Sequence, residues 1–148
     1  MKLKKTQPSE HRIQVALVEF LHMALKPEVV WSAIPNGEKR HIRVAQRLKN
    51  EGVRRGTPDL FFCLPEGRVA WLEMKAAKGS LSEDQKIFRD RVQALGHRWA
   101  LARSVDEAAI HLASWGVLKP SMGRFFQTNH LESIKLKPAK ELTSGTQA

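Results

Sequence analysis

Residues 56–75 read GTPDLFFCLPEGRVAWLEMK, and this stretch decides the fold. Two apolar runs, Leu60–Leu64 and Val69–Glu73, are separated by Pro65–Arg68, which has the residues of a turn. Because the connection has the length of a hairpin loop, the two runs are predicted to pair as antiparallel strands. The centre of the molecule should therefore be a sheet built on this hairpin.

The hairpin also brings charged side chains together. Strand side chains alternate between faces, so Glu73 and Lys75 should share one face while Met74 points away. Asp59 opens the first strand, where the hairpin could place it beside Glu73. Two carboxylates at one edge can hold Mg²⁺, and a neighbouring ammonium can orient a water or stabilise negative charge. These residues favour phosphodiester hydrolysis.

The same residues also allow a simpler interpretation. Asp59 could cap a turn, and Glu73 and Lys75 could form an exposed ion pair on an edge strand. A Glu-x-Lys sequence alone would favour that interpretation, because it often occurs by chance. The Pro58-Asp59 pair, the apolar flanks and the basic chain together favour a metal-dependent site instead.

Outward from the hairpin, apolar periodicity, caps and turn residues predict four helices and two further strands. The helices are expected over residues 10–25, 39–48, 80–95 and 104–115, and the strands over residues 29–34 and 99–102. Either Ser80 with Glu83 or Ser82 with Gln85 could form the capping box of the third helix. The fold class is therefore α/β, with a small mixed sheet flanked by helices in the order αβββαβ and a helical insertion.

One domain, residues 9–116, accounts for all these elements, between a tail over residues 1–8 and an arm over residues 117–148. Sparse apolar periodicity, with prolines and glycines, predicts that the arm is extended, with Phe125 and Phe126 as its anchors. The sequence leaves open whether the arm contacts a second subunit, contacts DNA or is disordered.

Charge indicates the kind of partner. The 148 residues include 25 Lys and Arg against 15 Asp and Glu, a net charge of +10, so a polyanion such as nucleic acid is expected. No apolar stretch of membrane-spanning length and no signal-peptide pattern is present, so a soluble, cytoplasmic protein is expected. The single cysteine, Cys63, excludes an internal disulfide and is expected to be buried in its apolar run.

Two further polar residues have both a functional and a structural interpretation. Glu10 shares a helical face with Ile13 and Leu17, so it should turn toward the core, where a carboxylate is costly unless it is paired or binds metal. Its place in the first turn equally suits the helix dipole.

Gln85 could be only a capping-box residue, or it could reach the scissile phosphate or a metal-bound water.

The region from residue 39 to residue 55 contains seven Lys or Arg and one acid, Glu51. A solvated helix face would explain such a run, but its one-sided charge favours contact with phosphates, which would be salt-sensitive and independent of sequence. The predicted nucleic-acid contacts are Asn36, Lys39, Arg40, Arg43, Arg47, Arg54, Arg55 and Lys78.

Taken in order, these segments resemble the virus-type replication-repair nuclease (VRR-NUC) domain of the PD-(D/E)xK nuclease superfamily, over roughly residues 9–116. The segments are EHRIQ (10–14), PNG (35–37) with Lys39-Arg40, LKNEG (48–52), GTPDL (56–60), WLEMK (71–75), and GSLS (79–82) with Gln85. The combination is far more specific than any one piece. The resemblance implies a restriction-endonuclease-like core.

The resemblance also implies roles for single residues. Asp59 and Glu73 would ligate Mg²⁺ or Mn²⁺, the Met74 backbone carbonyl would be a further ligand, and Lys75 would serve the nucleophilic water. Glu10 would be the first-helix carboxylate of the metal site, and Gln85 a contact to its ligands or to phosphate. Small phage and bacterial members of the family resemble Holliday-junction resolvases and act as homodimers, so branched DNA and a second subunit are the partners implied.

Two other functions remain open at this stage. A non-catalytic DNA-binding module on a nuclease fold is disfavoured because Glu10, Asp59, Glu73 and Lys75 are all present. A nuclease acting on flaps, single strands or RNA would be expected to have exposed stacking aromatics, and the sequence offers few outside predicted core positions.

Overall fold

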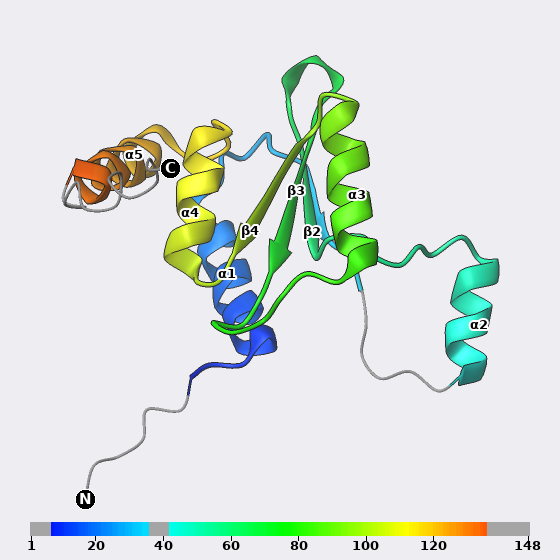
Figure 1. Cartoon of the computed structure of the whole chain (residues 1–148). Coiled ribbons are helices and arrows are strands. Elements are labelled where there is room, and N and C mark those ends of the chain that lie inside the picture. Colours follow the sequence, from blue (N-terminus) through cyan, green and yellow to red (C-terminus); the bar gives the residue numbers. More distant parts are fainter. Residues whose placement is uncertain (1–6, 36–41, 136–148) are drawn as a thin grey trace, which may run out of the picture.

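The computed structural model describes residues 7–35 and 42–135, with side chains up to residue 128. Its elements form a four-stranded mixed sheet with helices on both faces (Figure 1). In chain order they are α1 (Glu10–Ala24), β1 (Trp31–Ala33), α2 (Ile42–Asn50), β2 (Leu60–Cys63), β3 (Val69–Met74), α3 (Glu83–Ala94), β4 (Arg98–Ala102), α4 (Val105–Ser114) and α5 (Pro120–Lys135). This is the predicted α/β class and element order, and it agrees with a PD-(D/E)xK-like nuclease fold. Within the described residues, none of the helices has the length and apolar character needed to cross a membrane.

The sheet has the strand order β1-β2-β3-β4. β2 pairs with β1 and with β3 antiparallel, and the predicted hairpin is confirmed, with Pro65–Gly67 forming a short 3-10 turn between its strands. β4 adds to β3 in parallel, so β3 and β4 end at the same edge of the sheet. That shared edge is where Glu73 and the residues after it lie.

The core fills the space between one sheet face and helices α1 and α4. Alternation along β2 sends Leu60 and Phe62 into this core, where both are fully buried, and leaves Phe61 on the opposite face. On that opposite face α3 covers β3, with Phe88 edge-on to Trp71 at 5.1 Å between ring centroids. Figure 1 shows α1 and α4 on one side of the sheet and α3 on the other.

Local capping explains where the helices begin. Ser9 accepts a hydrogen bond from the Arg12 N–H at the start of α1, as predicted. Of the two capping boxes considered for α3, the one formed by Ser82 and Gln85 is present. The Ser82 hydroxyl accepts a hydrogen bond from the Gln85 N–H, and the Gln85 side chain accepts one from the Ser82 N–H. This places Gln85 in the first turn of α3, facing the edge where β3 ends.

Two predicted elements are present with different bounds, and one local prediction, the burial of Cys63, was wrong. The strand expected over residues 29–34 is only Trp31–Ala33, and the helix expected to end near Leu48 continues to Asn50. Cys63 is exposed rather than buried, because it follows the buried Phe62 and therefore points to the opposite face of the sheet.

The prediction of an extended arm after Gly116 was also wrong for the described residues. Val117 and Leu118 are buried, and Pro120–Lys135 forms helix α5, which packs on α4. Phe126 is an anchor as predicted, edge-on to Phe20 of α1 at 5.8 Å, whereas Phe125 is 58% exposed. Residues 136–148 lie outside the described residues, as do Asn36, Lys39 and Arg40.

Candidate active site

Hairpin pairing places Asp59 and Glu73 opposite one another. Leu60 is paired with Leu72, so Asp59, one residue before β2, lies across from Glu73 near the end of β3. Asp59 is 9% exposed and Glu73 is 2% exposed. The Oδ2 atom of Asp59 accepts a 2.7 Å hydrogen bond from the Met74 backbone N–H, while the Met74 side chain points into the core. The predicted juxtaposition of the two carboxylates is therefore present.

Lys75 and Gln85 both contact Glu73. The Lys75 ammonium lies 3.0 Å from Glu73 Oε1, and the Lys75 side chain is 13% exposed. Gln85 Nε2 donates a 2.6 Å hydrogen bond to the same oxygen. The Gln85 Oε1 caps α3, as one of the two sequence interpretations held, and its Nε2 contacts Glu73. A contact of Gln85 with the phosphate or a metal-bound water stays a prediction. The ion pair is largely buried, unlike the exposed edge-strand pair that the simpler interpretation required.

The electrostatics of the Asp59–Glu73 pair favour the binding of an additional positive charge. Burial is the main cause that raises the pKa of Glu73 to about 7, and the negative charge of Asp59 adds to the rise while Lys75 opposes it. Burial also raises the pKa of Asp59, although its hydrogen bond from the Met74 N–H opposes the change. When both buried carboxylates are ionised, the single Lys75 ammonium offsets only one of their two negative charges.

Glu10 lies at the same site but apart from the buried pair. It is half-buried in the first turn of α1, and its charge contributes to raising the pKa values of both Asp59 and Glu73. Across residues 7–35 and 42–135, no three His, Cys, Asp or Glu side chains form a group that could hold a metal. Glu10 thus faces the pair without completing a three-carboxylate cluster in this arrangement.

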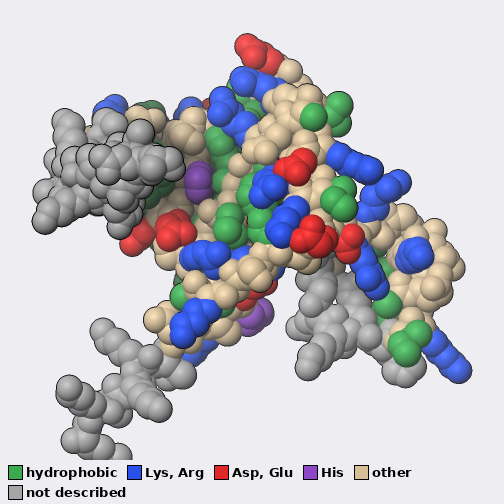
Figure 2. Space-filling view, in the orientation of Figure 1, with side chains coloured by type: hydrophobic (Ala, Val, Ile, Leu, Met, Phe, Trp, Pro, Cys, Tyr) green, Lys and Arg blue, Asp and Glu red, His purple; other side chains and the backbone are tan. Residues whose placement is uncertain are grey.

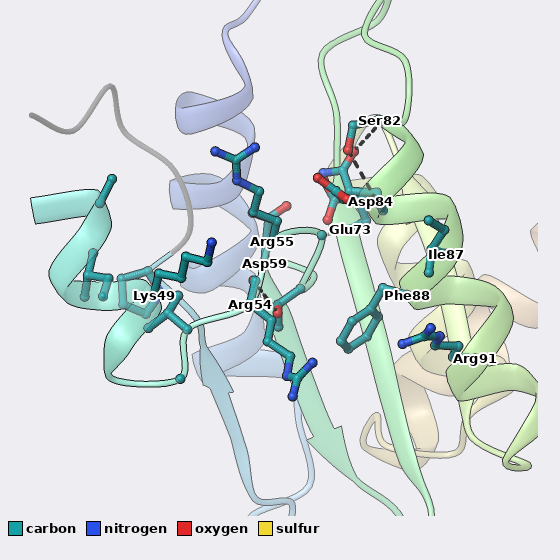
Figure 3. Close-up of a pocket in the computed structure, with 18 of the residues that line it drawn as sticks. Lys49, Arg54, Arg55, Asp59, Glu73, Ser82, Asp84, Ile87, Phe88 and Arg91 are labelled. Carbon is teal, nitrogen blue, oxygen red and sulfur yellow. Dashed lines mark hydrogen bonds between the residues drawn. The ribbon is translucent and has the colours of Figure 1, made fainter. Parts of the chain in front are cut away.

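The site opens into a cleft of about 1480 Å³ between α2 and α3. Figure 3 shows Lys49, Arg54 and Arg55 on one side of this cleft, and Ile87, Phe88 and Arg91 of α3 on the other. Its basic lining residues are Lys49, Arg54, Arg55, Lys75 and Arg91, and its acidic ones are Glu10, Asp59, Glu73 and Asp84. In Figure 2, Lys and Arg side chains follow α2 and the segment that joins it to the sheet. We call this feature the α2–α3 cleft.

Only some of the predicted nucleic-acid contacts line the α2–α3 cleft. Arg54 and Arg55 line the α2–α3 cleft, whereas Arg43 and Arg47 do not, and Arg47 instead pairs with Glu51 at 3.4 Å. Lys78 is exposed in the loop after β3 and also lies outside the cleft lining. Sequence analysis missed Lys49 and Arg91. No local pattern marks these two residues, because the faces of α2 and α3 that line the cleft depend on how the two helices lie in the fold.

Gly56 fixes how the Asp59 loop meets α3. Its φ is +80°, and a Cβ atom built there would lie 2.3 Å from the Asp84 carbonyl oxygen and 2.8 Å from the Gln85 nitrogen. Only glycine allows both this backbone conformation and this approach. The contact sets the distance between the loop that presents Asp59 and the helix turn that presents Gln85.

Comparisons with known proteins agree with this geometry. A solved structure described as a VRR_NUC domain protein is similar with a TM-score of 0.53 and 17% identity, over 76% of this chain and 90% of the other. At that identity the likeness shows a shared fold. No curated protein sequence matched the chain. The sequence model of the VRR-NUC domain matches residues 8–106, which is well over half of the chain. The chain therefore belongs to the VRR-NUC family and carries a nuclease-type domain.

Proposed function

We propose that this protein is a divalent-metal-dependent, structure-specific DNA endonuclease that hydrolyses phosphodiester bonds, with branched DNA such as Holliday junctions as its substrate. The observation that carries the proposal is the buried Asp59–Glu73 pair, joined to Lys75 and Gln85 at the α2–α3 cleft. A carboxylate pair suits a hard cation, and the basic lining suits phosphates. VRR-NUC membership supports nuclease chemistry in general.

The donor set fits Mg²⁺ or Mn²⁺. Asp59 and Glu73 would supply carboxylate oxygens and the Met74 carbonyl a further one, and the cation would offset the buried charges of the pair. Glu10 would become a ligand only by moving closer to the pair, because it does not complete the group in this arrangement. The cation, when bound, would lower the pKa of a water and neutralise charge on the phosphate.

The chain's own residues then have separate tasks. Lys75, held 3.0 Å from Glu73, would orient the attacking water or stabilise the developing negative charge. Gln85 would keep Glu73 in one orientation through its 2.6 Å hydrogen bond. Lys49, Arg54, Arg55 and Arg91 would hold the DNA backbone across the cleft. Cutting two strands of a junction symmetrically would require two such sites, so we also propose a homodimer.

The test uses labelled four-way junction, flap, linear duplex, single-stranded DNA and RNA, each with Mg²⁺, Mn²⁺ or EDTA. Metal-dependent cutting of the junction that is lost in Glu73→Ala and Lys75→Ala would support the proposal. Preferred cutting of flaps, single strands or RNA would replace the substrate class but keep the nuclease. DNA binding without cutting by the wild-type protein, in any metal, would overturn catalysis in favour of a binding module.

Metal affinity should depend on pH in a defined direction. Because burial raises the pKa of Glu73 to about 7, a cation that binds its ionised form must displace a proton below that pH. The apparent Kd for Mn²⁺ is expected to rise about tenfold for each pH unit below 7 and to level off above it. Titration calorimetry in two buffers of different ionisation enthalpy should show release of about one proton at pH 6. A Kd unchanged between pH 6 and pH 8 would contradict this expectation.

The cations that line the cleft should matter more for DNA binding than those on the outer part of α2. Lys49→Ala is expected to weaken binding of all DNA sequences alike and to lower the salt dependence of log Kd by about one. Arg43→Ala is the matched control, because it removes one positive charge from the same helix at a position outside the cleft lining. Fluorescence anisotropy over a salt series measures both. Equal losses in the two variants would count against binding in the cleft.

A further inference from the structure

Arg103 ties the end of β4 to the loop that follows β3. Its Nη1 atom donates 2.7 Å hydrogen bonds to the carbonyls of Ala76 and Gly79, with a longer 3.4 Å contact to the Ala77 carbonyl. Its backbone N–H is held by Glu107 Oε2 at 2.7 Å. Parallel pairing makes this possible, because β3 and β4 end at the same edge of the sheet. One guanidinium nitrogen therefore holds both ends of the turn over residues 76–79.

The far end of that turn packs against Lys75. A Cβ atom built on Gly79 would lie 3.3 Å from Lys75 Cδ and 3.4 Å from Lys75 Cβ, so the side of Gly79 that would carry a side chain faces the aliphatic stem of the lysine and leaves little room beside it. The Gly79 N–H also bonds to the Ala76 carbonyl at 2.9 Å, which closes the turn. The Lys75 stem thus lies beside a turn that Arg103 holds in place.

We propose that Arg103 is a positioning residue that fixes Lys75 beside Glu73 by clamping the turn over residues 76–79 onto the Lys75 stem. The inference rests on the proposed function only in taking Lys75 to act on the attacking water. A long lysine side chain loses conformational entropy when it is held in one rotamer. If the clamp already restricts the Lys75 stem in the folded protein, less of this entropy has to be lost when the transition state forms.

The first test measures Lys75 directly and needs no DNA. Lysines of the metal-free protein are labelled slowly with an amine reagent and quantified by mass spectrometry, with the exposed Lys49 of α2, which lies outside the clamped turn, as internal reference. Arg103→Gln is expected to raise the labelling rate of Lys75 severalfold relative to Lys49. Arg98→Gln is the matched control, because it removes the same charge from the opposite end of β4, and it should leave the ratio unchanged. An unchanged ratio in Arg103→Gln would overturn the proposal.

The second test uses cleavage kinetics. Arg103→Gln is expected to lower kcat by about 10- to 100-fold with little change in KM, because the misplaced group acts in the chemical step and not in DNA binding. Arg103→Lys should recover part of that loss, since an ammonium can donate from one nitrogen to the same carbonyls. Gly79→Ala should lower kcat by a different route that leaves Arg103 in place, because its methyl group would displace the Lys75 stem directly.

A double-mutant cycle separates positioning from general stability. In a Lys75→Met background, Arg103→Gln should cause no further loss of kcat, because the group it positions is gone. Losses that multiply in the double variant would overturn the proposal. If the wild-type protein cuts no DNA, the proposed function fails and the kinetic tests cannot be made. The labelling ratio still decides whether Arg103 holds Lys75.

Discussion

Glu73→Gln is expected to lower DNA cleavage by about 10²- to 10³-fold or more and at the same time to stabilise the metal-free protein above pH 7. The loss of activity follows from the loss of a metal-binding charge in the buried pair. The gain in stability follows from the pKa of Glu73, which burial raises from 4.5 to about 7. The folded state binds this proton more tightly than the unfolded chain does.

The sign of the stability change is fixed by that difference. Below pH 4.5 the Glu73 carboxyl is protonated in both the folded and the unfolded state, so it does not lower the free energy of unfolding. As the pH rises from 4.5 to about 7, this carboxyl ionises in the unfolded chain but stays protonated in the folded protein, so the free energy of unfolding falls. Above pH 7 the full loss is about 3 kcal/mol. Glutamine removes this cost but also loses the ion pair with Lys75, so a net gain of about 1 to 2 kcal/mol is expected at pH 8.

Urea unfolding in EDTA at pH 5 and pH 8 measures this prediction. The difference between Glu73→Gln and wild type should be large at pH 8 and small at pH 5. Glu28→Gln is a suitable control, because Glu28 is an exposed glutamate and should show no such dependence. Added Mn²⁺ should stabilise wild type and not Glu73→Gln. A variant that is less stable than wild type at pH 8 would mean that ionised Glu73 stabilises the metal-free fold.

The hairpin and the positions of its charged residues were predictable because short-range rules decide them. Turn residues over 65–68 set the antiparallel pairing, and strand alternation then placed Glu73 and Lys75 on one face, with Asp59 opposite. The same rules show why Cys63 was mispredicted. Its apolar neighbours suggested burial, whereas the alternation that buries Phe62 turns Cys63 outward.

Features that depend on tertiary contacts were not predictable. Pro120 and Gly123 suggested a broken chain, yet proline is favourable in the first turn of a helix, and α5 is held by the packing of Phe126 on Phe20. The role of Arg103 depends on carbonyls 24 and 27 residues earlier in the chain, which no local pattern connects to it. Which face of α2 lines the cleft likewise depends on where α3 lies.

Gly56→Ala is expected to cost about 2 to 5 kcal/mol of stability and to lower the cleavage rate by about 10²-fold. Two costs combine at this position: a φ of +80° is unfavourable for alanine, and the added methyl group would meet the Asp84 carbonyl at 2.3 Å. The backbone of α3 cannot yield as a flexible side chain would. The loop must therefore move away from α3, and Asp59, three residues further on, moves with it.

Gly52→Ala separates the two costs. Gly52 has a similar φ of +91°, but nothing lies within 4 Å of a Cβ built there, so its replacement carries the backbone strain alone, about 1 to 2 kcal/mol. The difference between the two variants in urea unfolding isolates the contact between the Asp59 loop and α3. If cleavage in Gly56→Ala falls no further than in Gly52→Ala, then the spacing between Asp59 and Gln85 is not what the glycine protects. If it falls further while the folded fraction at the assay temperature is equal, Gly56 sets the geometry of the carboxylate pair.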